Sequence, residues 1–182
     1  MTFSDLLRAT VLLVAGVATA LGAVSVLVAN RESDDLALAI AAGWWVVAAA
    51  IGLWLGRAER VGEATARVLA GARTATSLPA ESPGRIAFGR LWPIGLFALV
   101  VGGAGWVWPQ VAAIGAGYAI LIALAWRGRE AAVAAIEDRD GVRFYVEPSS
   151  AFEPLQLIRT PGLYRDRAPS ANPPPPPPAR SA

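Results

Sequence analysis

The stretch LWPIGLFALVVGGAGWVWPQVAAIGAGYAILIALAW, residues 91–126, holds 36 consecutive positions without a charged residue or a histidine. A bilayer core of about 30 Å is spanned by roughly 17 to 25 helical residues, so this run is too long for one membrane helix. It is just long enough for two, residues 91–107 and 111–126, joined by a tight turn. Pro109 supports the break, because proline disfavours helix in the preceding residue and suits the first position of a helix. One long kinked helix and a re-entrant loop are the alternatives.

Tryptophan and arginine residues stand where this hairpin would meet the two membrane surfaces. Both halves are short, at about 25 Å and 24 Å, so flanking side chains should help to hold them in place. Long cationic side chains can reach the interface, and tryptophans form belts there. We predict six interface anchors: Arg90, Trp92, Trp126 and Arg127 at one surface, and Trp106 and Trp108 at the other.

Two further uncharged runs, residues 9–29 and 36–56, precede the hairpin. The first is longer than the roughly 7 to 15 residues of a signal-peptide core, so we interpret it as a retained span and not as a cleaved signal. Residues 30–35 form an acidic connection, and Asp34 or Asp35 suits the cap of the next helix. The predicted fold class is an all-α integral membrane protein with transmembrane helices at about residues 9–29, 36–56, 91–107 and 111–126.

Small residues at four-residue spacing indicate faces along which these helices could pack, because small side chains allow close approach. The pattern is weak evidence here, since glycine makes up 18 of the 182 residues. It does not tell whether the packing partner lies in the same chain or in another copy. The helix-packing candidates are Gly16, Ala20, Ala48, Gly52, Gly56, Ala98 and Gly102.

The distribution of arginine predicts the orientation, because Lys and Arg accumulate in cytoplasmic connections. Arg31 alone lies in a connection of the proposed outer side. The proposed inner side holds Arg8, Arg57, Arg60, Arg67, Arg73, Arg85, Arg90, Arg127 and Arg129. We therefore predict a multi-pass protein of the cell membrane with both termini in the cytoplasm.

The regions outside the spans divide into a cytoplasmic loop and a tail. Residues 57–90 form the loop within the transmembrane domain 1–128, and we expect a helix over residues 57–78 that ends at the following prolines. The tail, residues 129–167, should continue the last helix to about residue 138 and turn at Asp140-Gly141. Alternation in VRFYV, residues 142–146, predicts a strand, and LQLIR, residues 155–159, predicts a weaker second strand of a short β-hairpin.

A proline-rich segment, residues 168–182, follows this tail and includes six consecutive prolines. Such a run forms an extended polyproline helix without a core, so we expect a disordered segment. A role as a recognition motif for an aromatic groove is the alternative.

Composition removes most of the groups that enzymes use. The chain has no histidine, which is the commonest general base and the commonest metal ligand. It has no cysteine either, so it has no thiol nucleophile. The acidic cluster Glu137, Asp138 and Asp140 lacks the spacing of a calcium loop, so we interpret it as a solvated helix end. No phosphate-binding or dinucleotide-binding motif is present in the sequence. We expect no enzymatic activity, no cofactor and no metal site.

Two functions remain open at this stage. The first is a non-enzymatic scaffold, accessory or assembly subunit that acts through the cytoplasmic loop and tail. The alternative is a small transport or pore-forming subunit that acts as an oligomer, although ionisable residues, which coupled transporters keep in their spans, are absent from all four runs. The expected partners are the lipid bilayer and other membrane proteins or copies of the same chain. A net charge of only +2 gives no indication of nucleic-acid binding.

Overall fold

The computed structural model describes residues 1–74, 82–147, 149, 151–153 and 155–161. These residues form five helices and three strands. The helices are α1 (Phe3–Glu32), α2 (Asp35–Leu55), α3 (Ala58–Ala70), α4 (Pro83–Gly105) and α5 (Pro109–Asp140). The strands are β1 (Arg73–Thr74), β2 (Val142–Val146) and β3 (Leu157–Pro161).

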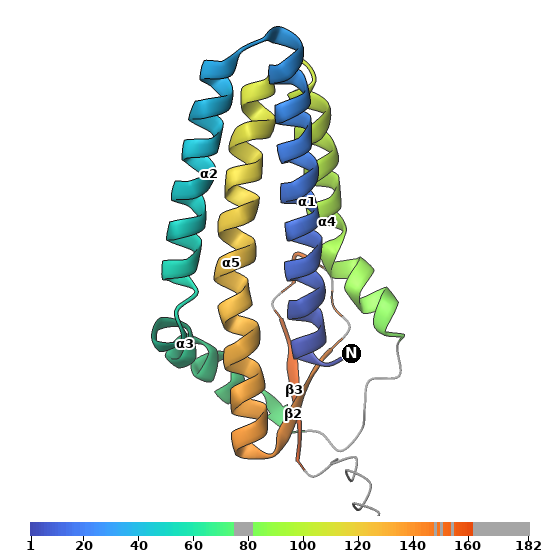
Figure 1. The fold of residues 1–182 in the computed structure, drawn as a ribbon. Helices are drawn as coiled ribbons and strands as arrows, with labels where there is room; N and C mark the ends of the chain where they lie inside the picture. The colour runs from blue at the N-terminus through green and yellow to red at the C-terminus, as the bar shows by residue number, and fades with distance from the viewer. Residues whose placement is uncertain (75–81, 148, 150, 154, 162–182) are drawn as a thin grey trace, which may run out of the picture.

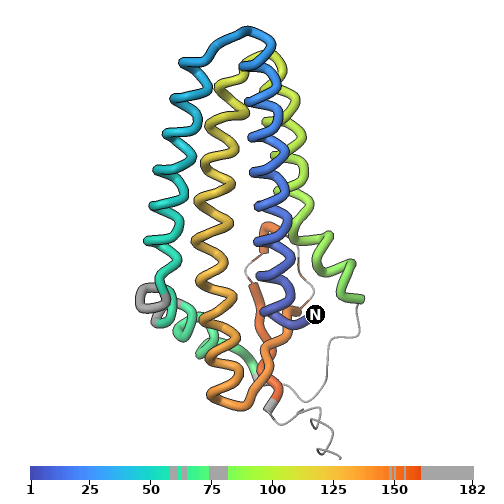
Figure 2. The backbone as a smooth tube through the Cα atoms, viewed as in Figure 1, coloured from blue at the N-terminus to red at the C-terminus, as the bar shows by residue number. Residues whose placement is uncertain are grey.

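Four long helices form a bundle in which α5 contacts each of the other helices (Figures 1 and 2). The α1–α2 connection and the α4–α5 turn lie together at one end, which we call the far end. The N-terminus, α3 and the sheet lie at the opposite end. All four long helices are long and apolar enough to cross a membrane, so the prediction of four such helices is confirmed. The predicted break at Pro109 is confirmed as well, because α5 begins there.

Three of these helices are longer than their uncharged runs. Helix α1 begins at Phe3, where the Thr2 hydroxyl accepts a hydrogen bond from the Asp5 amide, and it ends before Ser33, whose φ is 55°. Helix α5 continues to Asp140, and α4 already begins at Pro83 and contains Pro93. At 30 and 32 residues, α1 and α5 measure about 45 and 48 Å, well beyond a bilayer core of about 30 Å.

The segment after α2 differs from the prediction. The expected helix over residues 57–78 ends at Ala70, and strand β1 follows it. Strand β1 pairs in parallel with β3, and β3 pairs antiparallel with β2, giving the order β1-β3-β2. The predicted two-stranded hairpin is therefore part of a three-stranded sheet. Residues 75–81 and the predicted proline-rich tail, residues 168–182, lie outside the described residues.

The two predicted strands of the hairpin are close to the observed ones. Strand β2 covers residues 142–146 as predicted, whereas β3 begins at Leu157, two residues later than expected. The N-terminus joins this sheet, because the Val146 amide donates to the Met1 carbonyl at 3.1 Å and Thr2 forms a bridge with Tyr145. The start of α1 is thereby held against β2.

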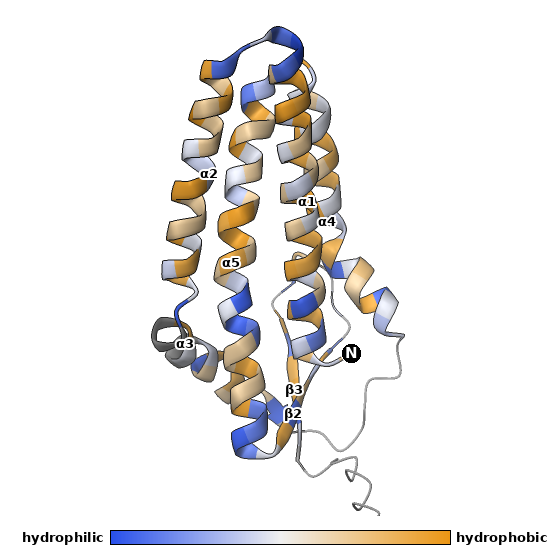
Figure 3. Ribbon diagram, viewed as in Figure 1, coloured by the Kyte–Doolittle hydropathy of each residue, from blue (hydrophilic) through white to orange (hydrophobic). Residues whose placement is uncertain are grey.

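Hydropathy varies along the bundle. Hydrophobic residues cover the middle lengths of the long helices, and hydrophilic residues gather at the α1–α2 connection and near the end of α5 (Figure 3). Helix α2 shows this most clearly, since only Ala41, Ala48 and Gly52 are buried along its length. Most of its large apolar side chains, among them Leu36, Ile40, Val46, Val47, Ile51 and Leu53, are exposed.

Candidate interaction surface at the base of the bundle

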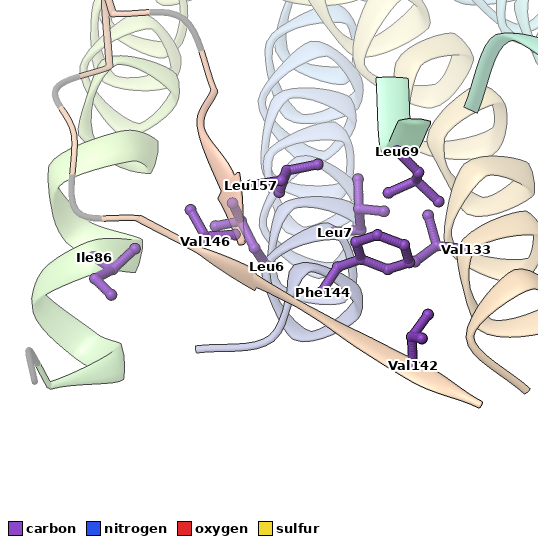
Figure 4. Close-up of a cluster of buried hydrophobic side chains, with 9 residues drawn as sticks. All are labelled: Leu6, Leu7, Leu69, Ile86, Val133, Val142, Phe144, Val146 and Leu157. Carbon is purple, nitrogen blue, oxygen red and sulfur yellow. The ribbon is translucent and has the colours of Figure 1, made fainter. Parts of the chain in front are cut away.

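The end of the bundle that carries the sheet has a buried core of its own. We call this end the base; it comprises α3, the three strands and residues 1–8, 82–90 and 127–141. The core draws side chains from α1, α3, α4, α5 and the two longer strands (Figure 4). Val133 and Val146 are fully buried at its centre. Its members are Leu6, Leu7, Leu69, Ile86, Val133, Val142, Phe144, Val146 and Leu157.

Glu137 fastens the end of α5 to strand β2. Its Oε1 accepts a hydrogen bond from the Phe144 amide at 3.1 Å, across a turn in which Gly141 takes a φ of 62°. Glycine adopts this left-handed conformation without the steric cost that a side chain would add. Glu137 is only 7% exposed, so the interpretation of the acidic cluster as a solvated helix end is wrong for this residue.

Burial also changes the chemistry of this carboxyl group, which lies about 16 Å beyond Trp126 along the helix and outside the predicted span. Desolvation raises the pKa of Glu137, and the hydrogen bond from Phe144 and the charge of Arg143 lower it in part. The role of Glu137 in this structure is to pair a strand amide that would otherwise be buried without a partner.

Exposed arginine side chains surround the core of the base. Arg139 forms an ion pair with Asp140 at 2.8 Å, but both groups are at the surface and such a pair adds little stability. At the far end, Arg31 stacks over the Trp106 ring at 5.1 Å. The exposed arginines of the base are Arg8, Arg67, Arg73, Arg85, Arg127, Arg129, Arg139, Arg143 and Arg159, and Arg57 is exposed directly before α3. The base is therefore a folded unit whose surface is rich in arginine and also carries the exposed carboxylates of Asp5, Asp138 and Asp140.

The structure separates the predicted interface anchors into two groups at opposite ends of the apolar lengths. Trp106 and Trp108 lie at the α4–α5 turn and are 53% and 61% exposed. Near the base, the Trp126 ring lies 5.3 Å below the Arg129 guanidinium, and the Trp92 ring meets Phe152 edge-on at 6.3 Å. Arg127 is exposed, and Arg90 donates to the Ser149 hydroxyl at 2.6 Å. Contact of these residues with a membrane surface stays a prediction.

The helix-packing candidates of α2 lie against α5 of the same chain. A Cβ atom added at Gly52 would stand 2.8 Å from the Leu121 carbonyl oxygen, and one at Gly56 would stand 2.7 Å from that of Leu124. Ala48 is fully buried on the same face. The two backbones therefore approach too closely for larger side chains at these positions.

The remaining candidates lie in more open positions. A Cβ atom at Gly102 of α4 would stand 3.7 Å from Leu21 of α1, which is ordinary contact, and Ala98 is half-buried. Gly16 and Ala20 on α1 are both exposed, and an added Cβ at Gly16 would meet no atom within 4 Å. Within the described part of the chain, the α1 row therefore has no close neighbour at Gly16.

Sequence reasoning missed a second contact between α2 and α5. The Trp45 indole donates to the Ala113 carbonyl at 2.9 Å, and the Trp44 indole donates to that of Ile114 at 3.4 Å. Gly117 lies directly under the Trp44 ring, where a Cβ atom would collide with the indole. The available signal was a tryptophan pair in α2, which the parallel arrangement of α2 and α5 brings level with a glycine-rich part of α5.

The comparisons add no relative: no family model, no curated protein and no solved structure matches this chain. Among the described residues, no group of three or more histidine, cysteine, aspartate or glutamate side chains is placed to hold a metal ion.

Proposed function

We propose that this protein is a multi-pass protein of the cell membrane and acts as a non-enzymatic scaffold, accessory or assembly subunit. In this proposal α1, α2, α4 and α5 cross the bilayer, both termini lie in the cytoplasm, and the base binds a partner there. The partner is another membrane-associated protein or a further copy of this chain.

The exposure of large apolar side chains supports the membrane placement. Leu99 on α4 is 76% exposed, and Val46 and Leu53 on α2 are 70% and 59% exposed. Contiguous apolar surface of this kind is rare on soluble monomers but suits helices that face lipid. The 21 residues of α2 measure about 32 Å, which matches a bilayer core of about 30 Å.

The folded base is the observation that carries the binding role. A connection between membrane helices needs no core, yet here the extra lengths of α1 and α5 pack with α3 and the sheet around the largest group of buried apolar residues. Ordering these segments costs conformational entropy. A role in binding a partner would explain why the chain folds them at this cost. The exposed arginines suit a partner with an acidic surface, because opposite charge speeds and orients association.

The transport alternative needs polar groups that face a pathway. Ser25 and Thr10 are buried in the helical bundle, but their hydroxyls donate to backbone carbonyls of their own helix, those of Leu21 and Leu6. A pore would have to form between copies, and its lining would come from surfaces that are apolar in one chain. This weighs against the alternative and leaves it to experiment.

Photo-cross-linking in living cells tests the proposal. A photoreactive amino acid replaces Arg67 or Arg143 at the base, and a matched variant carries it in place of Arg31, an exposed arginine at the far end. We expect a discrete adduct with an acidic protein from the base positions and none from Arg31.

Equal adducts from all three positions would contradict the binding role of the base. Self-adducts alone, together with a symmetric oligomer in detergent and ion flux in proteoliposomes, would establish the transport alternative in its place.

A further inference from the structure

A cavity of about 460 Å³ opens where the base joins the rest of the bundle, and residues of α1, α3, α4 and α5 line it. Most of its wall is apolar and includes Leu7, Leu91, Ile94, Trp126, Val133 and Leu155. Two arginines, Arg90 and Arg129, complete the lining together with Thr10 and Thr65. The volume falls within the roughly 300 to 1,000 Å³ of typical ligand sites, which are mostly apolar with few polar groups.

Arg90 lines this cavity, and one of its N–H donors has no hydrogen-bond partner among the described residues. Its Nη2 donates to the Ser149 hydroxyl at 2.6 Å and to the Glu153 carbonyl at 3.3 Å. Its Nε is buried and has no hydrogen-bond partner among the described residues. A buried donor without a partner costs free energy, so a ligand that accepts this hydrogen bond would be favoured.

Arg129 brings a second positive charge to the same cavity. Its guanidinium carbon stands 5.3 Å from the centre of the Trp126 ring, a cation–π arrangement that orients the side chain. The described residues that line the cavity include no carboxylate. Glu153 attracts Arg90 electrostatically but is not part of the lining. The cavity therefore pairs two cationic groups with a largely apolar wall.

The cavity lies across the level at which the proposed membrane would end. Leu91 and Ile94 belong to the predicted span 91–107, whereas Arg129 and Val133 lie beyond the end of the span 111–126. We propose that this cavity binds one anionic glycerophospholipid of the inner leaflet. Its phosphate contacts Arg90 and Arg129, and part of an acyl chain lies along Leu91, Ile94 and Trp126.

General chemistry supports this occupant. Guanidinium groups bind phosphate oxygens through paired hydrogen bonds, and basic pockets between membrane helices on the cytoplasmic side accommodate anionic headgroups. The inference rests on the membrane placement given above, but it does not depend on which partner the base binds.

Lipid binding to the full-length protein in mild detergent tests the assignment, with native mass spectrometry counting bound lipids. Dioleoylphosphatidylglycerol is the probe, dioleoylphosphatidylcholine tests for the headgroup, and glycerol phosphate separates a lipid site from a site for free phosphate. The test variant is Arg90→Gln with Arg129→Gln. The control is Arg127→Gln, which removes a neighbouring exposed arginine that does not line the cavity.

We expect the double variant to weaken phosphatidylglycerol binding by about tenfold or more, and Arg127→Gln to leave it nearly unchanged. Ala151→Trp fills the cavity and keeps both arginines, and it should also weaken phosphatidylglycerol binding. This variant tests the cavity independently of the loss of positive charge. Circular dichroism establishes that each variant is folded.

Three results would overturn the assignment: equal binding of phosphatidylcholine, equal losses in Arg127→Gln and the double variant, or displacement of the lipid by glycerol phosphate at a similar concentration. Resistance of the protein to alkaline extraction from membranes is measured separately. Extraction of the wild-type chain would refute the membrane placement itself, whereas a retained chain without phosphatidylglycerol preference would refute only the lipid site.

Discussion

The contact between α2 and α5 allows a test in which one substitution has opposite effects at two positions of the same helix. Gly52 and Gly43 both belong to α2. A Cβ atom at Gly52 would stand 2.8 Å from the Leu121 carbonyl oxygen and 3.0 Å from the Leu121 Cα atom. A Cβ atom at Gly43 would meet nothing within 4 Å. We therefore compare Gly52→Ala with Gly43→Ala.

The magnitudes follow from two opposing contributions. Replacing glycine by alanine inside a helix stabilises it by about 0.5 to 1 kcal/mol, because alanine loses less backbone freedom on folding. At Gly43 this gain stands alone. At Gly52 the new methyl group meets backbone atoms, which cannot rotate away, and overpacking of this kind costs about 1 to 3 kcal/mol. Gly52→Ala should therefore lower the free energy of unfolding by up to about 2 kcal/mol, whereas Gly43→Ala should raise it.

The assay is reversible unfolding by sodium dodecyl sulfate in mixed micelles, followed by circular dichroism. Adding Gly56→Ala to Gly52→Ala should deepen the loss, because a Cβ atom at Gly56 would stand 2.7 Å from the Leu124 carbonyl oxygen. If Gly52→Ala proves at least as stable as the wild-type protein, or if both single variants lose equal stability, the close approach of α2 and α5 described here is refuted.

Three further predictions concern the base and the hairpin. Phe144→Ala should destabilise the base by about 3 to 5 kcal/mol, since the side chain is 3% exposed, whereas Phe152→Ala, at 81% exposed, should change thermal stability little; equal effects would contradict the core. The raised pKa of Glu137 means that its contribution to stability is complete below its ordinary value of 4.5 and is lost as pH rises through the folded-state pKa. Glu137→Gln should abolish that part of the pH dependence in unfolding measured from pH 4 to 8, and an unchanged profile would refute it. Leu99→Arg should impair insertion of the α4–α5 hairpin more than Leu53→Arg impairs insertion of α2. A charge at a helix centre costs about 2.5 to 3.5 kcal/mol, and the predicted span 91–107 is shorter than the span 36–56, so it has less length with which to shift the charge to the interface. Thiol tagging of the α4–α5 turn measures this, and equal tagging in both variants would oppose it.

The absence of charge located the apolar helices but not their ends. Helix α1 extends to Phe3 and Glu32 because polar residues continue the same hydrogen-bonded spiral beyond the apolar run. Helix α4 begins at Pro83, eight residues before the uncharged run, and Pro93 lies within it. Hydropathy identifies the length that is apolar, and capping decides where the helix ends.

Local patterns in the sequence could not predict contacts between segments that lie far apart along the chain. Strand β1 has two residues and pairs with β3 about 85 positions later, so no periodicity within residues 57–78 could indicate it. Glu137 stands among acidic neighbours that are exposed, and its burial follows only when β2 folds back across α5. The glycine row of α2 was recognisable from its spacing, but the identity of its partner, α5, needed the three-dimensional arrangement.

The central claim is that the bundle crosses a bilayer with its far end outside and its base inside. The chain contains no cysteine, so Ser33→Cys at the far end and Arg143→Cys at the base each introduce a unique thiol. Labelling of intact cells with a membrane-impermeant maleimide should modify Ser33→Cys at once and Arg143→Cys only after permeabilisation. Protection of Ser33→Cys in intact cells, or modification of Arg143→Cys without permeabilisation, would contradict the account.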